Sequence, residues 1–580
     1  MKFDNILEYI GQFGPYQVRI YILVCLIGGP VAMNSMAQVF FGAASDHWCA
    51  VDEWDQEVKR CTDERNNGMM EDYLSCIHKY RNISIPVAVD DNGEVYYERC
   101  SKYEIYTNWS DYMIVNQTTL TTGCDVGWVY DRSMSTRTII TDFDLVCGKK
   151  SAASLAQSMF FFGVLMGSLI FGVVSDFVGR YYSFFFAVTA VSLLSLANAF
   201  VPSFWMYTLL RFFIGVVNNG SFILAFIIGT ELVGPSMRNV AGIVIEMFFS
   251  CGYMLLAVLA YFIRDWRHLQ LVIGAPTLLF LIAIPFVPES ARWLISKKKF
   301  DKAEKIVLKA AKVNGKSDKL PPNFIQELQE TDTSVSCEQG NGGVLEKTPT
   351  LIDLFRTPNL RTGTFILMYN WFINSVVYYG LSLSTSGLGA NPYVAFFISG
   401  AVELPAYFLC IPAIESPLGR KYSISGFELI GGIACLVTIF LPLGAWRTTV
   451  AMVGKFGISA SFALVYIYSA EVFPTPVRAT GVGICSMSAR VASMICPFIL
   501  YLDDVWKPLP LLIFGSSAII GGLLLLLLPE TRGKPLPETM QDGETFFTKI
   551  ESREREMSTR ATGASDLGRT GGIYNYSYEA

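Results

Sequence analysis

The sequence predicts an all-α membrane protein with twelve transmembrane helices, arranged in two halves of six helices. Three observations lead to this fold class. Of the 580 residues, 52% are hydrophobic and only 16% are charged, whereas charged residues make up about a quarter of an ordinary soluble domain. Apolar stretches long enough to cross a bilayer recur along the chain, and short motifs between them repeat at a fixed distance. The composition alone excludes an ordinary soluble protein.

The apolar stretches set the order of the segments. A helix needs about 20 apolar residues to cross about 30 Å of hydrocarbon, and such stretches begin near residues 18, 151, 182, 205, 240, 268, 363, 393, 423, 447, 477 and 508. The first 17 residues lack the basic region and cleavage site of a signal peptide, so we expect no removable signal peptide. The predicted segments are the N-terminus at 1–17, helix 1 at 18–41, an extracellular loop at 42–148, helices 2 to 6 at 151–287, a cytoplasmic loop at 288–360, helices 7 to 12 at 361–529 and a cytoplasmic tail at 530–580.

The loop at 42–148 has the composition of a glycosylated extracellular segment. It holds six of the 13 cysteines, and an even number predicts three disulfides in an oxidising compartment. Free thiols and chance acceptor motifs are the alternative, but the two signals agree. Six cysteines allow fifteen pairings, so the connectivity stays open. The cysteines are Cys49, Cys61, Cys76, Cys100, Cys124 and Cys147, and the Asn-x-Ser/Thr acceptors are Asn82, Asn108 and Asn116.

The orientation in the membrane follows from this loop. If residues 42–148 lie outside, counting the helices places both termini and the loop at 288–360 in the cytoplasm, and we expect the plasma membrane as the location. The segment "SKKKFDKAEKIVLKAAK" (296–312) agrees, because lysine-rich loops stay on the cytoplasmic side. We interpret this amphipathic segment as a loop or interfacial helix rather than as a nucleic-acid-binding patch.

Motifs at the helix ends repeat about 240 residues apart. "ELVGPSMR" returns as "EVFPTPVR", and "SDFVGR" returns as "ESPLGR", both at an offset of 240, while "PESARWL" and "PETRG" begin 241 residues apart. Each motif lies at a predicted cytoplasmic helix end, where charges of the two halves can pair when the inner side is shut. We therefore predict a gate formed twice, with helix capping and topology as the alternative role for any single residue. The predicted gate residues are Asp176, Arg180, Glu231, Arg238, Arg420, Glu471 and Arg478.

Longer segments carry a family resemblance: "TDFDLVC" before helix 2, "PESARWL" after helix 6, "NWFINSVVYYGLSL" in helix 7, "GAVELPAY" in helix 8 and "YSAEVFPTPVRATGVG" into helix 11. In these the chain resembles the organic cation, anion and zwitterion transporter family of the major facilitator superfamily. "YFIRDWR", "MVGKFG" and "ARVAS" are similar to its carnitine and zwitterion branch. The resemblance implies the major facilitator fold, secondary transport by alternating access and a central cavity for small organic ions. Tyr181 stands where a second basic residue is usual, which implies a weaker gate on that side.

Charged residues within the predicted helices mark the candidate site, because a charge in hydrocarbon is costly unless it faces a wet cavity or a partner. Glu403 and Arg490 lie near the middle of helices 8 and 11, and Glu246 lies nearer the cytoplasmic side of helix 5. Arg211 and Lys455 lie about two turns from outer helix ends, so their side chains are candidates for reaching the interface. An internal ion pair between Glu403 and Arg490 is the structural alternative to a substrate site.

The family resemblance gives two of these charges a role. Arg490 occupies a cavity position where cation-specific branches carry Asp and where anion and carnitine branches carry Arg, which implies a bidentate clamp for a carboxylate. Glu246 aligns with a neutral amide of the cation branches, and we predict that it meets an amine.

Aromatic side chains complete the predicted cavity. Trp371 and Tyr378 share one face of helix 7, with Asn374 between them, and the resemblance places both rings at cavity positions. Such rings attract a quaternary or protonated amine, although most aromatic residues in membranes only pack or anchor. The predicted substrate-binding residues are Arg490, Glu246, Glu403, Trp371, Tyr378, Asn374, Phe222, Tyr253, Tyr466 and Tyr468.

Together these signals favour a secondary active transporter of small organic ions, either an organic cation or a carnitine-like zwitterion. An organic anion exchanger and a non-transporting sensor are the alternatives. We expect no enzyme, because the three histidines are not spaced as metal ligands and "GTELVGPS" has Pro235 where a phosphate-binding loop needs Lys. The expected partners are the substrate ion and membrane lipid, without nucleic acid or a cofactor, and Na⁺ is a candidate coupling ion. The oligomeric state is not predicted.

Overall fold

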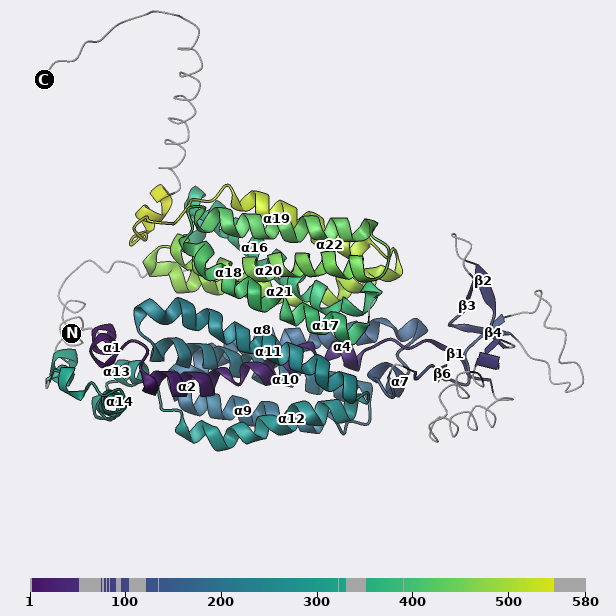
Figure 1. Ribbon diagram of the computed structural model, residues 1–580, viewed down its shortest axis with the longest axis horizontal. Coiled ribbons are helices and arrows are strands. Elements are labelled where there is room, and N and C mark those ends of the chain that lie inside the picture. The colour runs from purple at the N-terminus through teal and green to yellow at the C-terminus, as the bar shows by residue number, and fades with distance from the viewer. Residues whose placement is uncertain are drawn as a thin grey trace, which may run out of the picture.

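The computed structural model contains two bundles of helices that lie side by side along their length (Figure 1). It describes residues 3–51, 75, 78–79, 81–82, 84–89, 95–103, 121–133, 135–321, 323–329, 351–389 and 391–546. Within this described part, ten helices are long and apolar enough to cross a membrane. The helices α16 (Pro358–Leu383), which carries many polar side chains, and α22 (Leu509–Leu525), which has 17 residues, pack within the second bundle and complete the predicted twelve.

The first bundle contains the predicted helices 1 to 6. Helix 1 is broken into three pieces, and the second piece begins at Gly28, two residues before Pro30, which has no backbone N–H to donate. A Cβ atom on Gly252 would lie 2.4 Å from the Cα of Gly29, so helices 1 and 5 cross at a distance that only glycine permits. The members of this bundle are α2 (Pro15–Cys25), α3 (Gly28–Met36), α4 (Gln38–Phe41), α8 (Ser151–Val178), α9 (Arg180–Asn198), α10 (Phe204–Leu232), α11 (Arg238–Phe262) and α12 (Trp266–Ala283).

The second bundle repeats this order with helices 7 to 12. In both bundles a short 3₁₀ helix, η3 (Pro235–Met237) or η8 (Thr475–Val477), connects the fourth helix to the fifth inside the repeated motif. Helix 8 is broken at Val402, directly before Glu403. The remaining members are α17 (Pro392–Ala401), α18 (Glu403–Glu415), α19 (Gly419–Phe440), α20 (Ala445–Val472) and α21 (Arg478–Tyr501).

The two ends of the bundles differ in what they carry. We call the end with the repeated Glu-to-Arg motifs the gate end and the end with the loop at 42–148 the loop end. The gate end carries α1 (Phe3–Ile10), α13 (Ala291–Ser296) and α14 (Phe300–Val313), and the loop end carries α7 (Ile139–Phe143) (Figure 1). The lysine-rich segment is thus a helix, as predicted. Further 3₁₀ helices are η2 (Cys147–Lys149), η4 (Ile284–Phe286), η5 (Ser317–Lys319), η6 (Leu351–Phe355), η7 (Thr385–Leu388) and η9 (Leu502–Asp504).

The loop end also contains β-structure, which the all-α prediction did not include. Three antiparallel pairs of short strands form there, and all three pairs lie in or beside the cysteine-rich loop (Figure 1). The pairs are β1 (His47–Cys49) with β6 (Trp128–Tyr130), β2 (Val87–Val89) with β3 (Val95–Tyr97), and β4 (Ser101–Tyr103) with β5 (Thr121–Gly123).

Two disulfides hold these strands. One joins Cys49 to Cys124 and the other joins Cys100 to Cys147. The other two predicted disulfide cysteines, Cys61 and Cys76, lie outside the described residues, so the third disulfide stays a prediction.

Of the three predicted glycosylation sites, only Asn82 lies in the described part of the chain. Its side chain is exposed, as an acceptor of a glycan must be. Asn108 and Asn116 lie outside the described residues, and glycosylation stays a prediction at all three.

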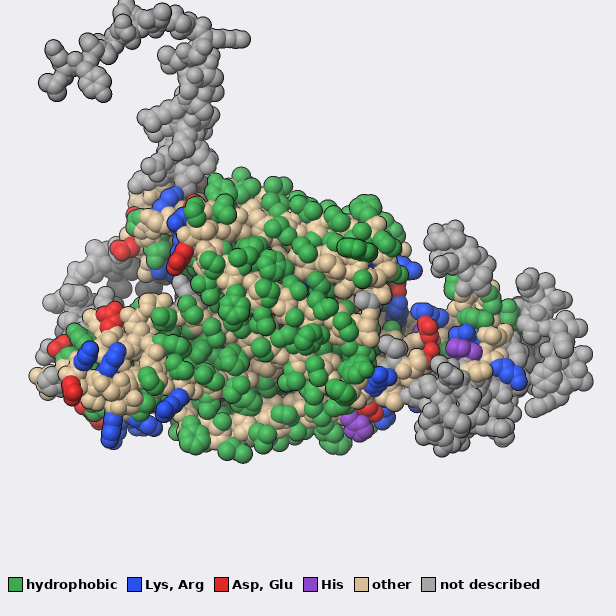
Figure 2. Space-filling model, in the orientation of Figure 1, with side chains coloured by type: hydrophobic (Ala, Val, Ile, Leu, Met, Phe, Trp, Pro, Cys, Tyr) green, Lys and Arg blue, Asp and Glu red, His purple; other side chains and the backbone are tan. Residues whose placement is uncertain are grey.

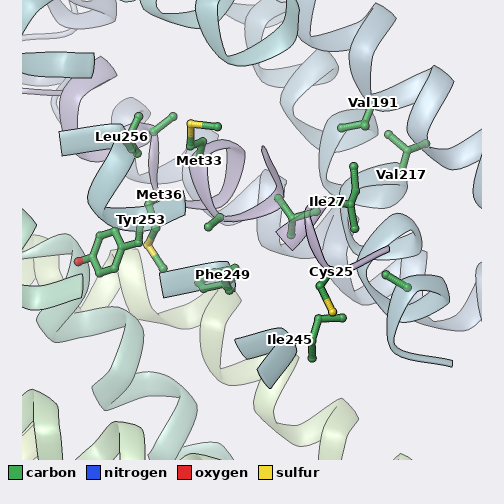
Figure 3. Packing of buried hydrophobic residues seen from close by; sticks show 14 of the residues in the cluster. Cys25, Ile27, Met33, Met36, Val191, Val217, Ile245, Phe249, Tyr253 and Leu256 are labelled. Atoms are coloured by element: carbon green, nitrogen blue, oxygen red, sulfur yellow. The ribbon is translucent and has the colours of Figure 1, made fainter. Parts of the chain in front are cut away.

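Apolar side chains cover the flanks of both bundles and charged ones collect at the two ends, as expected for helices that face lipid (Figure 2). Inside the first bundle, Met33 and Met36 of α3 pack with Phe249, Tyr253 and Leu256 of α11 (Figure 3). These contacts fix helix 5, which carries Glu246, against helix 1.

Candidate functional site

A cavity of about 340 Å³ lies between the two bundles. Its wall includes Arg238, the first residue of α11 at the gate end, and Glu246, about two turns further along that helix. A second cavity of about 120 Å³ shares part of this wall and reaches Tyr378 of α16. The side chains that line both cavities are Phe222, Glu246, Tyr407, Phe462, Tyr466 and Arg490.

The cavity wall carries opposite charges from opposite halves. Glu246 comes from α11 of the first bundle, and Arg490 comes from α21 of the second. Arg490 donates from Nη1 to the carbonyl of Ser486 at 2.8 Å and to the hydroxyl of the same residue, while its Nε is buried without a partner. Among the described residues, neither charge has an ion-pair partner. Both therefore remain able to bind a ligand of opposite charge.

The loop end of the cavity is closed by contacts between the halves. The Tyr253 hydroxyl of the first half donates to Ser399 of the second at 3.1 Å, and the Tyr253 ring lies 4.2 Å from that of Phe396. Lys150 and Asp504 form an ion pair across the same end. The larger cavity thus extends to Arg238 at the gate end, while these contacts close the loop end.

The gate residues of the first half pair within that half. Arg180 donates to Asp176 at 2.6 Å and to Glu231 at 3.3 Å. Arg238 pairs instead with Asp4 of α1 at 2.5 Å, a partner that the sequence analysis did not name.

The gate residues of the second half show the same pattern. Arg420 pairs with Glu471 at 2.9 Å, and Arg478 donates from Nε to the carbonyl of Phe473 at 3.2 Å. Within the described ranges, no ion pair between the predicted gate residues joins the two halves. This agrees with a gate that is open in this conformation.

Two glutamates of the third repeated motif, Glu289 and Glu530, hold the glycine turns that precede the third helix of each half. Glu289 accepts the backbone N–H groups of Arg180 and Tyr181, at 2.8 and 3.1 Å, at the start of α9. Gly179 precedes this turn with φ 113°, and a Cβ atom there would lie 2.4 Å from the Glu289 carboxylate. A side chain would therefore clash as well as strain the backbone.

The second half contains the same device. Glu530 accepts the N–H groups of Arg420 and Lys421, both at 3.0 Å, beside Gly419 with φ 76°. The carboxylates face the positive end of each helix dipole. The two glutamates were not among the predicted gate residues, although both directly follow the proline of a repeated motif, 241 residues apart.

Glu403 pairs with Lys455, so the predicted alternative of a Glu403–Arg490 pair is wrong. The Glu403 and Lys455 charges are 2.9 Å apart and both side chains are fully buried. Ser250 of the first half donates to Glu403 at 2.5 Å, and the Lys455 ammonium donates to Ser382 at 2.6 Å. The break in helix 8 brings Glu403 to the start of α18, where it meets helix 10.

Arg211 and Lys455 do not reach the membrane interface, because both side chains are fully buried. Arg211 donates to the carbonyl of Asn34 at 3.0 Å and to Gln157 at 2.9 Å, and its guanidinium lies 4.3 Å from the Phe160 ring centroid. Polar neighbours and an aromatic ring within the bundle thus stabilise part of this buried cation, while its Nε has no hydrogen-bond partner in the described part of the chain.

Five of the predicted substrate-binding residues line the described cavities: Arg490, Glu246, Tyr378, Phe222 and Tyr466. The cavities also contain aromatic rings that were not predicted: Tyr379, Tyr407, Phe462, Phe161, Phe249 and Phe226. Two of these had a local signal, because Tyr379 follows Tyr378 and Phe462 lies one helical turn before Tyr466.

The other five predicted residues lie away from the cavity wall in this conformation. Trp371 stands behind Tyr466, with ring centroids 4.2 Å apart, and donates to Ser469. Glu403 is held by Lys455, and Tyr253 lies in the contact between the halves. Asn374 donates to Asn370, and the Tyr468 hydroxyl donates to the carbonyl of Pro529 at 2.6 Å.

Potential metal ligands come together at one place in the described part, where His47 lies near Cys100 and Cys147. These two cysteines form a disulfide and are therefore unable to ligate as thiolates.

Comparison with known proteins agrees with this architecture. The model of the "Sugar (and other) transporter" family matches residues 102–542. The organic cation transporter protein of Drosophila melanogaster is 40% identical over 561 residues, covering 96% of both chains. Solute carrier family 22 member 3 of Rattus norvegicus is 37% identical, covering 93% of this chain and 95% of its own. The inward open conformation of the xylose transporter XylE from E. coli has the same fold, with a TM-score of 0.55, 19% identity and coverage of 70% of this chain and 93% of its own.

Two six-helix bundles around a central cavity define a membrane transporter of the major facilitator superfamily, not an enzyme. The chain belongs to the sugar (and other) transporter family and, within it, to solute carrier family 22, and its relatives include organic cation transporters. The family resemblance read from the motifs is thereby confirmed. Transporters of this type need no cofactor.

Proposed function

We propose that this transporter carries small organic ions that bear an ammonium group, and that it accepts zwitterions that also bear a carboxylate. The observation that supports this most is that Glu246 and Arg490 both line the cavity and that neither forms an ion pair among the described residues. An ammonium group would face Glu246, and a carboxylate would accept two hydrogen bonds from the Arg490 guanidinium. The rings of Tyr378, Tyr466 and Phe222 would surround the cationic end.

The position of the two charges on different halves suggests how binding is coupled to movement. A zwitterion that contacts both Glu246 and Arg490 bridges the first and second bundles, so its affinity is highest where the bundles are closest around it. A ligand shifts a conformational equilibrium by its difference in affinity for the two states. Substrate would therefore favour closure of the open gate end, which is the step that alternating access requires.

The gate residues would complete that closure. Arg478 forms no ion pair among the described residues in this conformation, and Arg238 is held by Asp4. When the gate end shuts, we propose that these arginines pair with carboxylates of the opposite half. The gate end would be cytoplasmic and the loop end extracellular in the plasma membrane. The disulfides of the loop end and the lysine-rich helix at the gate end support this orientation.

A paired uptake assay tests the proposed substrate class. One zwitterion, a carnitine-like compound, and one permanent organic cation are compared in wild type, Arg490→Ala and Glu246→Gln, each corrected for surface expression. A charged hydrogen bond contributes about 1.5 to 3 kcal/mol, so Arg490→Ala should weaken the apparent affinity for the zwitterion about tenfold or more. The permanent cation should be unaffected or enter more easily. Glu246→Gln should impair the cation most.

The matched control is Tyr468→Phe, because Tyr468 was predicted to bind substrate but lies away from the cavity wall. This variant should leave the ratio of the two uptake rates unchanged. Equal impairment of both substrates by Arg490→Ala would contradict the carboxylate site. Repeating the panel with Na⁺ replaced by a larger cation tests Na⁺ as the coupling ion.

A further inference from the structure

We infer that the lysine-rich surface of α13 and α14 binds the headgroups of anionic phospholipids in the membrane leaflet at the gate end. The surface consists of six exposed lysines at the end of α13 and along α14, and we call it the lysine patch. Its members are Lys297, Lys299, Lys302, Lys305, Lys309 and Lys312.

The spacing on α14 gathers four of these lysines on one face. Lys302, Lys305, Lys309 and Lys312 follow one another at steps of three, four and three residues, which keeps them within a quarter of the helix circumference. The opposite face, lined by Ala303, Val307, Ala310 and Ala311, is buried against the rest of the protein. The lysine side chains therefore point away from the bundle.

Nearby carboxylates do not neutralise the lysine patch. Asp301 and Glu304 lie on the same helix, but among the described residues neither forms an ion pair with a lysine of the patch. The six lysines outnumber these two acids, so the face keeps a net positive charge. Such a surface attracts anions.

The lysine patch begins at the surface that faces lipid. The Lys297 ammonium lies 5.8 Å from the ring centroid of Phe177 at the end of α8. The Phe177 side chain is 75% exposed, and so is that of Phe286 just before α13, as expected for residues in contact with lipid. Figure 2 shows Lys and Arg side chains at the gate end of the first half, beside the apolar flank of the bundle.

Charge and position together favour a lipid headgroup over a soluble anion. A lysine held near an anionic membrane surface contributes about fivefold to binding, which corresponds to about 1 kcal/mol. The apolar side chains of Leu308 and Val313 flank the lysines and are 47% and 40% exposed. A helix with a basic stripe and apolar edges is suited to the boundary between headgroups and acyl chains.

The test uses the full chain in nanodiscs that contain a mixture of phosphatidylserine and phosphatidylcholine. Native mass spectrometry then gives the ratio of the two lipids that stay bound after release. Wild type is compared with Lys302→Gln/Lys309→Gln and with the control Lys149→Gln/Lys507→Gln, which removes two exposed lysines at the loop end. Glutamine keeps the helix propensity of lysine, so the patch variant should fold.

We expect wild type to retain phosphatidylserine in preference to phosphatidylcholine. The patch variant should lose this preference by about fivefold for each lysine removed, and the control should keep it. Equal retention of the two lipids by wild type would overturn the inference. Loss of the preference to the same extent in the control would also overturn it, because the effect would then come from overall charge.

Discussion

The buried ion pair between Glu403 and Lys455 is the contact for which a large effect on stability can be predicted. The two charges are 2.9 Å apart and neither side chain has exposed surface. Replacing Glu403 with Gln removes the negative charge and leaves the buried Lys455 ammonium without a counter-charge, with neutral acceptors such as the Ser382 hydroxyl at 2.6 Å and the Tyr378 carbonyl at 3.4 Å. Loss of one partner from a buried pair costs about 3 to 5 kcal/mol, so Glu403→Gln should be strongly destabilising.

Removing both charges should restore much of this loss. In Glu403→Gln/Lys455→Met no charge remains in the interior, and an apolar replacement of a buried pair is often close to neutral. Lys455→Met alone should be destabilising, because Glu403 would then keep a buried negative charge with the hydrogen bond from Ser250 as its support. The double variant should therefore be more stable than either single variant.

The assay is thermal unfolding of the purified variants in one detergent, combined with the amount of each that reaches the cell surface. The control is the exposed pair between Lys150 and Asp504, with side chains that are 52% and 33% exposed. Removing the charges of such a pair should change stability by about 1 kcal/mol or less. If the losses of the two buried single variants add in the double variant, the charges are not coupled and the reasoning is refuted.

Two further predictions concern the gate. Arg478→Ala should lower the rate of transport more than it lowers substrate binding, since Arg478 has no ion pair within the described part of this open-gate conformation; a normal rate at a normal surface level would contradict its role. Gly179→Ala should lower the unfolding temperature, because its φ of 113° and the contact with Glu289 both oppose a side chain, at a cost of about 1 to 3 kcal/mol. Gly172→Ala, where a Cβ atom would meet nothing within 4 Å, should be neutral or stabilising, and equal effects of the two would refute the argument.

The helix order could be predicted from the sequence because the bilayer imposes it. A helix must span a fixed thickness, so each span appears as an apolar stretch of that length. The structure places the starts of the spans close to the predicted positions, for example Arg238 against 240 for helix 5 and Ala445 against 447 for helix 10. The breaks in helices 1 and 8 were not predicted from the lengths of the apolar stretches, although Pro30 after two glycines is a sequence signal for the break in helix 1.

The cavity wall was predicted less completely. Tyr466 lines the cavity and Tyr468 does not. Residues that are two positions apart on a helix differ by about 200° in direction, so their side chains face opposite sides. The sequence identified the helix but did not fix its rotation about its axis. Trp371 shows the same limit: it belongs to the aromatic cluster but contacts Tyr466 from behind.

The sequence by itself determined the class of this protein, since the apolar spans, the doubled motifs and the intramembrane charges are all local properties of the chain. Only the tertiary structure decided which charges meet. Glu403 lies 2.9 Å from Lys455, on a different helix, while Arg490 is left facing the cavity with Glu246. Coulomb attraction depends on the distance between charges in a medium of low dielectric constant. That distance is set by how helices far apart in the chain pack and rotate against one another.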